Sequence, residues 1–543
     1  MAVSNIEQSV ITNSLVAAAH EMGTKLIRCA HSPIVREAQD CSAAIIDRDG
    51  RVVAQAELIP IQLGSITHTL KPCLDLYPPE TLVEGDFFIN NDPYHGGQHI
   101  QDIFLFSPIF HGGELLGYSA SVVHHIDLGG GAPGLNPYAG DVHQEGIIFP
   151  PSKYNLHRDW NGGSFQRMIA ANVRMPEATI GDLNAQFAAN IIGAKRLQAL
   201  ARRYGRDGLV GAMDEMLSYS ERRMRAAIAT LPDGVYSAEA AMDDDGIGDT
   251  PVVIRAQVAI RDDAIHISFD GTDGQVPTNL NNPFASTFAA AVACAKSVLT
   301  DADIPFNDGV SRVISAEAPF GSVLNPKPPA PVRARLLPSY RVFNAVMKAL
   351  AQVVPEQVMA EGYDTTTPVC LSHLGPTGYN IYLEILGGGY GAGLGNDGCD
   401  GVDSPLSNCA NIPIESLEMD YPFMRLERYA LRPGSGGAGA QRGGLGFERS
   451  YRILADGVQF ATYGDRFTSP AEGLFGAGDG APAETHIQRG KEKIPLRSKT
   501  GRPVLKGDLL VVRTGGGGGY GPLEKRSLAD TERDTVLGLD IPA

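Results

Sequence analysis

Histidines and acidic residues crowd into one stretch of this chain. Seven of the 13 histidines in the 543-residue sequence lie between positions 68 and 143, several times more than a uniform spread would place there. Neutral imidazole and carboxylate groups together suit a divalent ion such as Zn²⁺ or Mn²⁺. The stretch is therefore the first place to expect a metal site. Its histidines are His68, His95, His99, His111, His124, His125 and His143, and the acidic residues among them are Asp92, Asp102, Asp127, Asp141 and Glu145.

A predicted β-hairpin gives three of these residues a common location. Its two strands flank a turn at Gly112-Gly113. Antiparallel pairing about that turn puts Asp102 opposite Val123, with His124 beside it. His99 lies three residues before Asp102, in the loop that enters the same strand. We expect two imidazoles and a carboxylate to converge there. Spacing alone leaves open the alternative that these are hydrogen-bonded turn residues without a metal.

The residues that follow His124 add polar groups at the same end of the hairpin. In a regular strand His125 points to the face opposite His124. We therefore place His125 and Asp127 behind the ligands or in contact with substrate. A hydrogen-bonded surface pair is the alternative for these two residues.

Other motifs argue against nucleotide binding and covalent catalysis in this chain. Gly129–Gly134 matches G-x-G-x-x-G, but it contains a proline and no helical pattern follows, so we expect no dinucleotide site. The sequence has no G-x-x-x-x-G-K-[ST] and no G-x-S-x-G. Two glycine-rich runs could form either tight turns or a loop whose backbone amides bind an anion. These runs are Gly434–Gly439, for which turns are favoured, and Gly515–Gly519. We assign no cofactor-binding residues.

Composition restricts the class of protein. The formal net charge of −17 opposes binding to nucleic acid or anionic lipid. No apolar run is long enough to span a membrane. The seven cysteines form no C-x-x-C pair, and the N-terminus has neither a basic segment nor an apolar one, so we expect a cytoplasmic protein without a disulfide framework.

Hydrophobic patterns predict an α+β, multi-domain, β-rich fold with an N-terminal helix and a central helical segment. Ser4 and Glu7 form a capping box for a helix that reaches about Cys29. Helices are also expected over 185–231, 286–299 and 340–360, and strands over 43–46, 51–54, 87–89, 103–110, 114–123, 252–260 and 264–270. We expect a metal-binding α+β domain over 1–235, a mixed α/β domain over 236–386 and a glycine-rich β domain over 387–543.

Ordered motifs along nearly the whole chain resemble the hydantoinase B/oxoprolinase family. This family includes the B subunits of ATP-dependent hydantoinases and lactamases, and related subunits of acetone carboxylases. The matching motifs are His31-Ser-Pro33, Gln39-Asp-Cys-Ser42, Asn91-Asp-Pro-Tyr-His-Gly-Gly97, His99-Ile-Gln-Asp102, His124-His-Ile-Asp-Leu-Gly-Gly130, Asp141-Val-His-Gln-Glu-Gly146, Asn411-Ile-Pro-Ile-Glu415 and Arg442-Gly-Gly-Leu-Gly446.

The resemblance implies one divalent ion, Zn or Mn, held by Asp40, His99, Asp102 and His124. Asp40 is the ligand that hairpin geometry does not supply. The resemblance also implies a partner: an A-type subunit with an actin-like ATPase fold, which binds ATP and Mg and assembles with this chain into a hetero-oligomer such as A2B2. That partner would phosphorylate the substrate's carbonyl oxygen.

The favoured function is therefore the hydrolysis of a cyclic amide that is activated by phosphorylation, as in hydantoinases, lactamases and 5-oxoprolinases. Water activated by the metal would attack the ring carbon, with His125, Asp127, His143 and Glu145 as candidate proton carriers. Two alternatives remain: a subunit of an ATP-dependent ketone carboxylase, and a scaffold subunit without a catalytic role.

Overall fold

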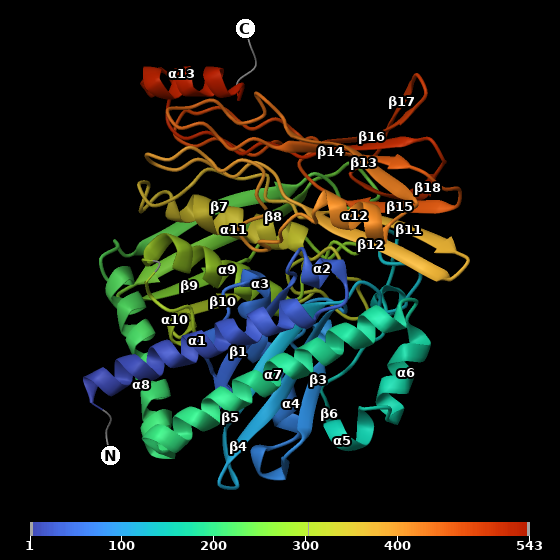
Figure 1. Cartoon of the computed structure of the whole chain (residues 1–543). Helices are drawn as coiled ribbons and strands as arrows, with labels where there is room; N and C mark the ends of the chain where they lie inside the picture. Colours follow the sequence, from blue (N-terminus) through green and yellow to red (C-terminus); the bar gives the residue numbers. More distant parts are fainter. Residues whose placement is uncertain (1–3, 302, 540–543) are drawn as a thin grey trace.

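The computed structural model describes residues 4–301 and 303–539. Within these residues the chain forms an α+β fold with four separate sheets of six, four, four and five strands. Long helices pack beside the first two sheets (Figure 1), and they include the expected N-terminal helix and central helical segment. Among the described helices, none is long and apolar enough to cross a bilayer. One apolar cluster includes buried residues from Ile11 to Val512, and the domain boundaries stay a prediction.

The six-stranded sheet carries the histidine-rich stretch. Its strand order is β2-β1-β5-β4-β3-β6, and every neighbouring pair is antiparallel. The bounds are β1 Cys41–Asp47, β2 Val52–Gln55, β3 Asp86–Asn90, β4 Asp102–His111, β5 Glu114–His124 and β6 Ser152–Asn155.

Helices cover both faces of this sheet. Successive side chains of a strand point to opposite faces, and apolar side chains on each face pack against a helix. Phe104 and Phe106 pack with helix α4 (Ile66–Leu76). Ile103 and Leu105 belong to the cluster on the opposite face, where α7 (Pro176–Tyr204) lies. Helix α1 (Asn5–Cys29) packs beside α7 and against β1. In α1 the Ser4 side chain accepts from the Glu7 amide and the Glu7 side chain accepts from the Ser4 amide, so the predicted capping box is confirmed.

The register of the β4–β5 hairpin differs by one residue from the prediction. Near the turn, Phe110 pairs with Leu115, as a turn at Gly112-Gly113 requires. A bulge between Ile109 and Phe110 then shifts the ladder, so Asp102 pairs with His124 and not with Val123. A bulge adds one residue to one strand and moves every later pair. The shift brings the two predicted ligands directly opposite each other.

The middle of the chain forms a four-stranded sheet with helices against it. Its order is β10-β9-β8-β7, with β9 and β10 parallel. Helix α11 packs on β7 and β8, and it ends at Leu350 although a helix was expected to Ala360; Pro355 follows within that range. The bounds are α8 Arg206–Ile228, β7 Gly234–Met242, β8 Val252–Arg261, β9 Ala264–Ser268, α9 Phe284–Leu299, α10 Asp308–Ser311, β10 Ile314–Glu317 and α11 Leu336–Leu350.

Two further sheets form most of the C-terminal third. Their orders are β12-β11-β15-β18 and β13-β14-β19-β16-β17. The bounds are β11 Thr367–Gly375, β12 Gly378–Leu386, α12 Ile414–Asp420, β13 Met424–Leu431, β14 Phe447–Ile453, β15 Val458–Tyr463, β16 Glu484–Arg489, β17 Glu492–Pro495, β18 Lys499–Val504, β19 Leu509–Arg513 and α13 Leu528–Leu537.

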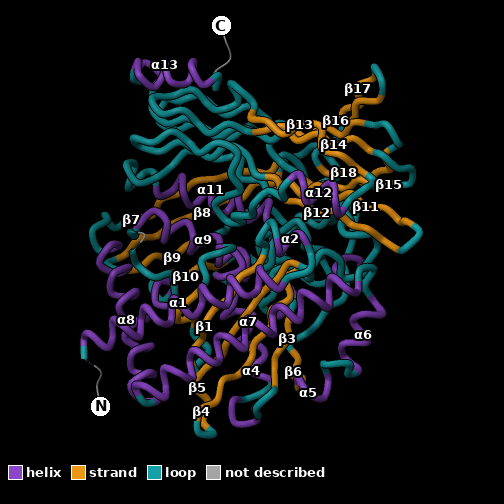
Figure 2. The backbone as a smooth tube through the Cα atoms, in the orientation of Figure 1, coloured by secondary structure: helices purple, strands orange, loops and turns teal. Residues whose placement is uncertain are grey.

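The glycine-rich runs bond to one another through their backbones. Apart from a turn at Gly434, they run side by side as long loop segments below α13 (Figure 2). Their amides bond to carbonyls of neighbouring runs, as from Gly437 to Gly517 and from Gly517 to Gly444. A Cβ at Gly443 would collide with the Gly517 carbonyl oxygen. Glycine is needed here because the backbones pack directly against each other.

Candidate metal centre

Three predicted ligands meet where β4 begins and β5 ends. Asp102 is the first residue of β4, and His124 is the last residue of β5. His99 lies in the loop before β4, and its carbonyl accepts the Asp102 amide at 3.1 Å. The hairpin and this short turn therefore bring the backbones of all three residues together.

The two histidine rings face the same oxygen of the Asp102 carboxylate. The Oδ1 atom of Asp102 lies 3.2 Å from His99 Nε2 and 3.4 Å from His124 Nδ1. All three residues are buried, and one potential ligand atom from each lies within 4.8 Å of the others. The spacing and the donor types are those of a group that could hold a metal ion.

The imidazole of His99 is presented in the form that a metal requires. Its Nδ1 lies 3.0 Å from the carbonyl oxygen of Arg333, which can only accept, so Nδ1 carries the proton and Nε2 has a free lone pair. Burial, with the Arg335 cation adding to it, lowers the pKa of His99 to about 3, so the ring is neutral. The Nε2 atom of His99 has no hydrogen-bond partner among the described residues. A buried lone pair without a donor fits a divalent cation.

Asp40, the ligand implied only by the family resemblance, lies next to this group. It precedes β1, and its carbonyl accepts the His124 amide at 3.1 Å. Its Oδ2 lies 3.7 Å from His124 Nδ1. The Gln62 side chain donates to Asp40 Oδ1 at 2.9 Å and to Asp102 Oδ1 at 3.3 Å, and thus holds the two carboxylates side by side. The role of Asp40 as a fourth ligand stays a prediction.

Arg335 is a site residue that the sequence reasoning missed. It immediately precedes α11, and its Nη2 donates to Asp102 Oδ2 at 2.5 Å and to Gln98 Oε1 at 2.6 Å. Burial acts to raise the pKa of Asp102, but the Arg335 cation opposes it, and that pKa lies well below its usual range. Asp102 therefore stays ionised, with Oδ2 paired to Arg335 and Oδ1 turned towards the two histidines. Nothing in local spacing joins residues 233 positions apart.

Two of the predicted proton carriers have partners outside the three-residue group. The Nε2 of His125 lies 3.4 Å from Gln186 Oε1, and burial lowers the pKa of His125 to about 4. The Asp127 carboxylate forms an ion pair with Arg174 at 2.9 Å. Both residues anchor the segment after β5 to α7 and to the loop that precedes it.

The other two predicted carriers lie on a short 3-10 helix, Val142–Glu145. Glu145 is buried, and its carboxylate accepts the backbone amides of Val332 and Arg333 at about 3 Å. Burial, opposed by these amides, raises the pKa of Glu145 to about 7. His143 is exposed. The structure therefore gives Glu145 a bracing contact, and proton transfer by any of the four residues stays a prediction.

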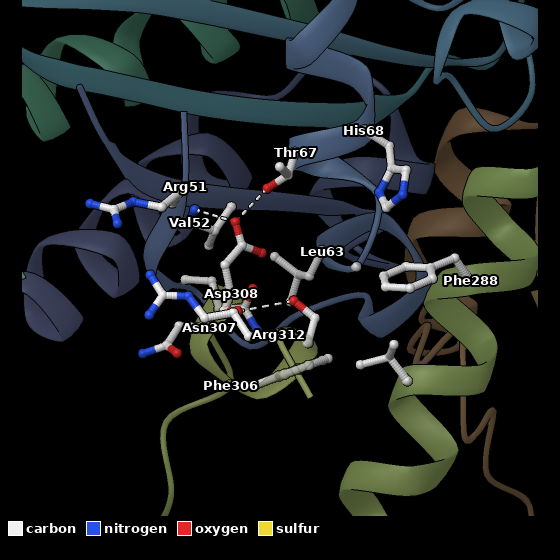
Figure 3. A pocket seen from close by; sticks show the side chains of 14 residues that line it. Arg51, Val52, Leu63, Thr67, His68, Phe288, Phe306, Asn307, Asp308 and Arg312 are labelled. Carbon is white, nitrogen blue, oxygen red and sulfur yellow. Dashed lines mark hydrogen bonds between the residues drawn. The ribbon is translucent and has the colours of Figure 1, made fainter. Parts of the chain in front are cut away.

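The remaining histidines of the stretch are dispersed. The His68 ring packs on Phe288 at 4.8 Å and lines a separate cavity of about 280 Å³, with Asp308 and Arg312 on another wall (Figure 3). His95 lies 2.8 Å from Asp92, and His111 ends β4 at the turn. In the described part of the chain, only His99 and His124 share a carboxylate in the manner of a metal site.

The sequence is similar to proteins named as enzyme subunits over nearly its full length. It is 35% identical to the B subunit of a putative D-/L-hydantoinase from Pseudomonas sp. (strain NS671), over 96% of this chain and 91% of that protein. It is 31% identical to the beta subunit of the caprolactamase of Pseudomonas jessenii, over 99% of this chain and 94% of that one.

Solved structures agree with this relationship. The crystal structure of the ATP-dependent caprolactamase from Pseudomonas jessenii matches with a TM-score of 0.90 at 28% identity, over 99% of this chain and 95% of that chain. An acetone carboxylase chain matches with a TM-score of 0.87 over 99% of this chain and 78% of that one, but at 19% identity it shows the fold alone. The hydantoinase B/oxoprolinase family model matches residues 4–523, and the chain belongs to that family.

Proposed function

We propose that this chain is the metal-bearing subunit of a two-subunit, ATP-dependent hydrolase of cyclic amides. The observation that carries the proposal is the buried group of His99, Asp102 and His124, in a chain that aligns almost end to end with a hydantoinase B subunit and a caprolactamase beta subunit. A divalent ion held there would polarise a carbonyl group or a water molecule.

The chain's own residues prepare this centre. The Arg333 carbonyl fixes the tautomer and direction of His99. Arg335 keeps Asp102 ionised, and Gln62 holds Asp40 beside it. Such contacts behind the ligands fix their orientation and tune a metal site. The burial of the group keeps bulk water from competing for the ion.

The activation step is assigned to a partner. An amide resists water because its nitrogen donates electrons into the carbonyl, and phosphorylation of the oxygen removes that donation and creates a leaving group. The sequence has no P-loop for ATP, and the hydantoinase and caprolactamase relatives are named as B or beta subunits. An A-type subunit that binds ATP and Mg is the expected partner.

The test is co-expression with an A-type ATPase subunit, followed by assays on hydantoins, lactams and 5-oxoproline. We expect ring opening that needs ATP and both subunits, and that is lost in His99→Ala without loss of assembly. ATP use that depends on bicarbonate and acetone would replace the proposal with the carboxylase alternative. Full turnover after chelation, with no bound metal, would favour a scaffold role.

A further inference from the structure

Two arginines of the loop before α11 contact the metal centre, Arg335 through its side chain and Arg333 through its backbone carbonyl, and only Arg335 has an ion-pair partner. Arg335 contacts Asp102 and Gln98. Arg333 is 4% exposed, yet among the described residues no carboxylate lies within 4.0 Å of its guanidinium, and its Nε has no hydrogen-bond acceptor. An unpaired buried cation is unusual because burial removes the hydration that stabilises the charge.

The backbone of Arg333 is tied to the centre on both sides. Its amide donates to Glu145 Oε1 at 2.8 Å. Its carbonyl oxygen lies 3.0 Å from His99 Nδ1 and accepts from the Tyr463 hydroxyl at 3.4 Å. The side chain therefore starts from a fixed point one contact away from a metal ligand.

The charge of Arg333 acts on two groups of the C-terminal region. Burial raises the pKa of Tyr463, and the Arg333 cation opposes that rise. Burial also raises the pKa of Cys370 to about 12, again with Arg333 opposing it. Tyr463 ends β15 and Cys370 lies in β11. Both residues belong to the sheet β12-β11-β15-β18, which the Arg333 backbone contacts through the Tyr463 hydroxyl.

We propose that Arg333 binds a phosphate oxyanion at the metal centre: the phosphoryl group of the activated amide, or the phosphate released from it. This inference rests on the proposed function, in which a phosphorylated ring reaches this chain. A guanidinium is always charged and offers paired donors to phosphate oxygens. A neutral ring amide needs no such cation, whereas a phosphoryl dianion does. The Tyr463 hydroxyl, whose present bond is long, is a second donor within the same site.

Thermal denaturation of the full-length chain tests the proposal without partner or ATP. We expect inorganic phosphate to raise the unfolding midpoint of the wild type but not that of Arg333→Met. In buffer without phosphate, Arg333→Met should unfold no earlier than the wild type, because it loses an unpaired buried charge. Arg341→Met is the matched control: Arg341 is also buried but donates to the Asp364 carbonyl at 2.6 Å, so its loss should lower the midpoint and leave the phosphate response intact.

Calorimetric titration with phosphate gives a second readout that does not depend on folding of the Met variant. Arg333→Lys keeps the charge but loses the paired donors, and should weaken phosphate binding by about tenfold, the loss of one charge-assisted hydrogen bond. Each titration is run with metal-loaded and with chelator-treated protein. The comparison separates phosphate that is bound by the metal ion from phosphate that is bound by Arg333. Acetate at equal ionic strength should give no comparable binding.

Three results would overturn the assignment: equal response to acetate, unchanged phosphate binding in both variants, or destabilisation of Arg333→Met as large as that of Arg341→Met. These outcomes are separable from the proposed function. If the complex hydrolyses ring amides but phosphate binding does not depend on Arg333, only this inference is contradicted. If phosphate binding depends on Arg333 but no ring amide is hydrolysed, only the hydrolase proposal is contradicted.

Discussion

The Nδ1 atom of His99 lies 3.0 Å from the carbonyl oxygen of Arg333, a residue 234 positions further along the chain. The first part of the chain thus provides the ligand atoms, and the loop before α11 determines which nitrogen of His99 faces them. The same loop is braced by Glu145 through its amides. The centre is therefore complete only when the N-terminal sheet and the α11 region are folded together.

The three-residue group should bind one divalent ion per chain. Because His99→Ala and His124→Ala each remove a ligand, we expect metal affinity to fall by more than about 100-fold, beyond the effect of losing a residue behind the ligands. Elemental analysis after dialysis against a chelator measures this. His143→Ala is the matched control, since His143 is exposed and outside the group. Asp40→Asn tests the fourth ligand: unchanged affinity would leave Asp40 as a hydrogen-bonded neighbour.

The sequence predicted the convergence of this group because hairpin pairing is local. The turn at Gly112-Gly113 and the alternation of the strands were enough to place Asp102 beside His124. The bulge that makes them direct partners could not be predicted, because Ile109 and Phe110 read as ordinary strand residues. A bulge is decided by how a strand packs against its neighbours.

The close packing of β5 makes this register sensitive to one glycine. Gly117 pairs with Asp47 of β1 and with Ile109 beside the bulge. A Cβ at this position would collide with the Ile46 carbonyl oxygen, so we expect Gly117→Ala to lower the free energy of unfolding by about 1–3 kcal/mol. Urea titration measures the change. Gly211→Ala, in open space on α8, is the control and should stabilise by up to about 1 kcal/mol.

The contacts of Arg335, Arg333 and Glu145 could not be predicted from the sequence because they join distant parts of the chain. Arg335 and Arg333 act on residues of the hairpin from more than 200 positions away. Glu145 appeared in the same acidic cluster as the ligands, and its type suggested proton transfer. In the structure its carboxylate accepts two backbone amides, a contact that only the folded loop supplies, and proton transfer by Glu145 stays a prediction. Sequence periodicity and residue spacing indicate local geometry only. They therefore cannot reveal these tertiary contacts.

Arg335 should be essential for stability as well as for the centre. Arg335→Met leaves the Asp102 carboxylate buried without its cation, and removal of one partner from a buried pair costs about 3–5 kcal/mol. We expect the urea midpoint to fall with an unchanged slope. Arg196→Met removes the exposed ion pair with Glu21 and should cost less than about 1 kcal/mol. A loss for Arg335→Met no larger than this control would mean that Asp102 is not held by the arginine.

Glu145 should make the stability of the chain depend on pH. Its pKa is raised from 4.5 to about 7, chiefly by burial. Because the folded state binds this proton more tightly, the group's contribution to stability is complete below about pH 4.5 and is lost as the pH rises through about 7. Glu145→Gln cannot ionise, so its stability relative to the wild type should rise by about 3 kcal/mol between pH 4.5 and 8.

Denaturant titrations of both proteins at pH 4.5 and pH 8 measure that difference, with the exposed Glu84→Gln as the control for the substitution itself. A difference that is equal at the two pH values would show that the buried carboxyl is ionised throughout, held so by the amides of Val332 and Arg333. The same pair of proteins separates bracing from proton transfer. If Glu145 only braces the loop, Glu145→Gln changes the stability but not the shape of the pH–rate profile. If Glu145 transfers a proton, the change in rate near pH 7 disappears in Glu145→Gln.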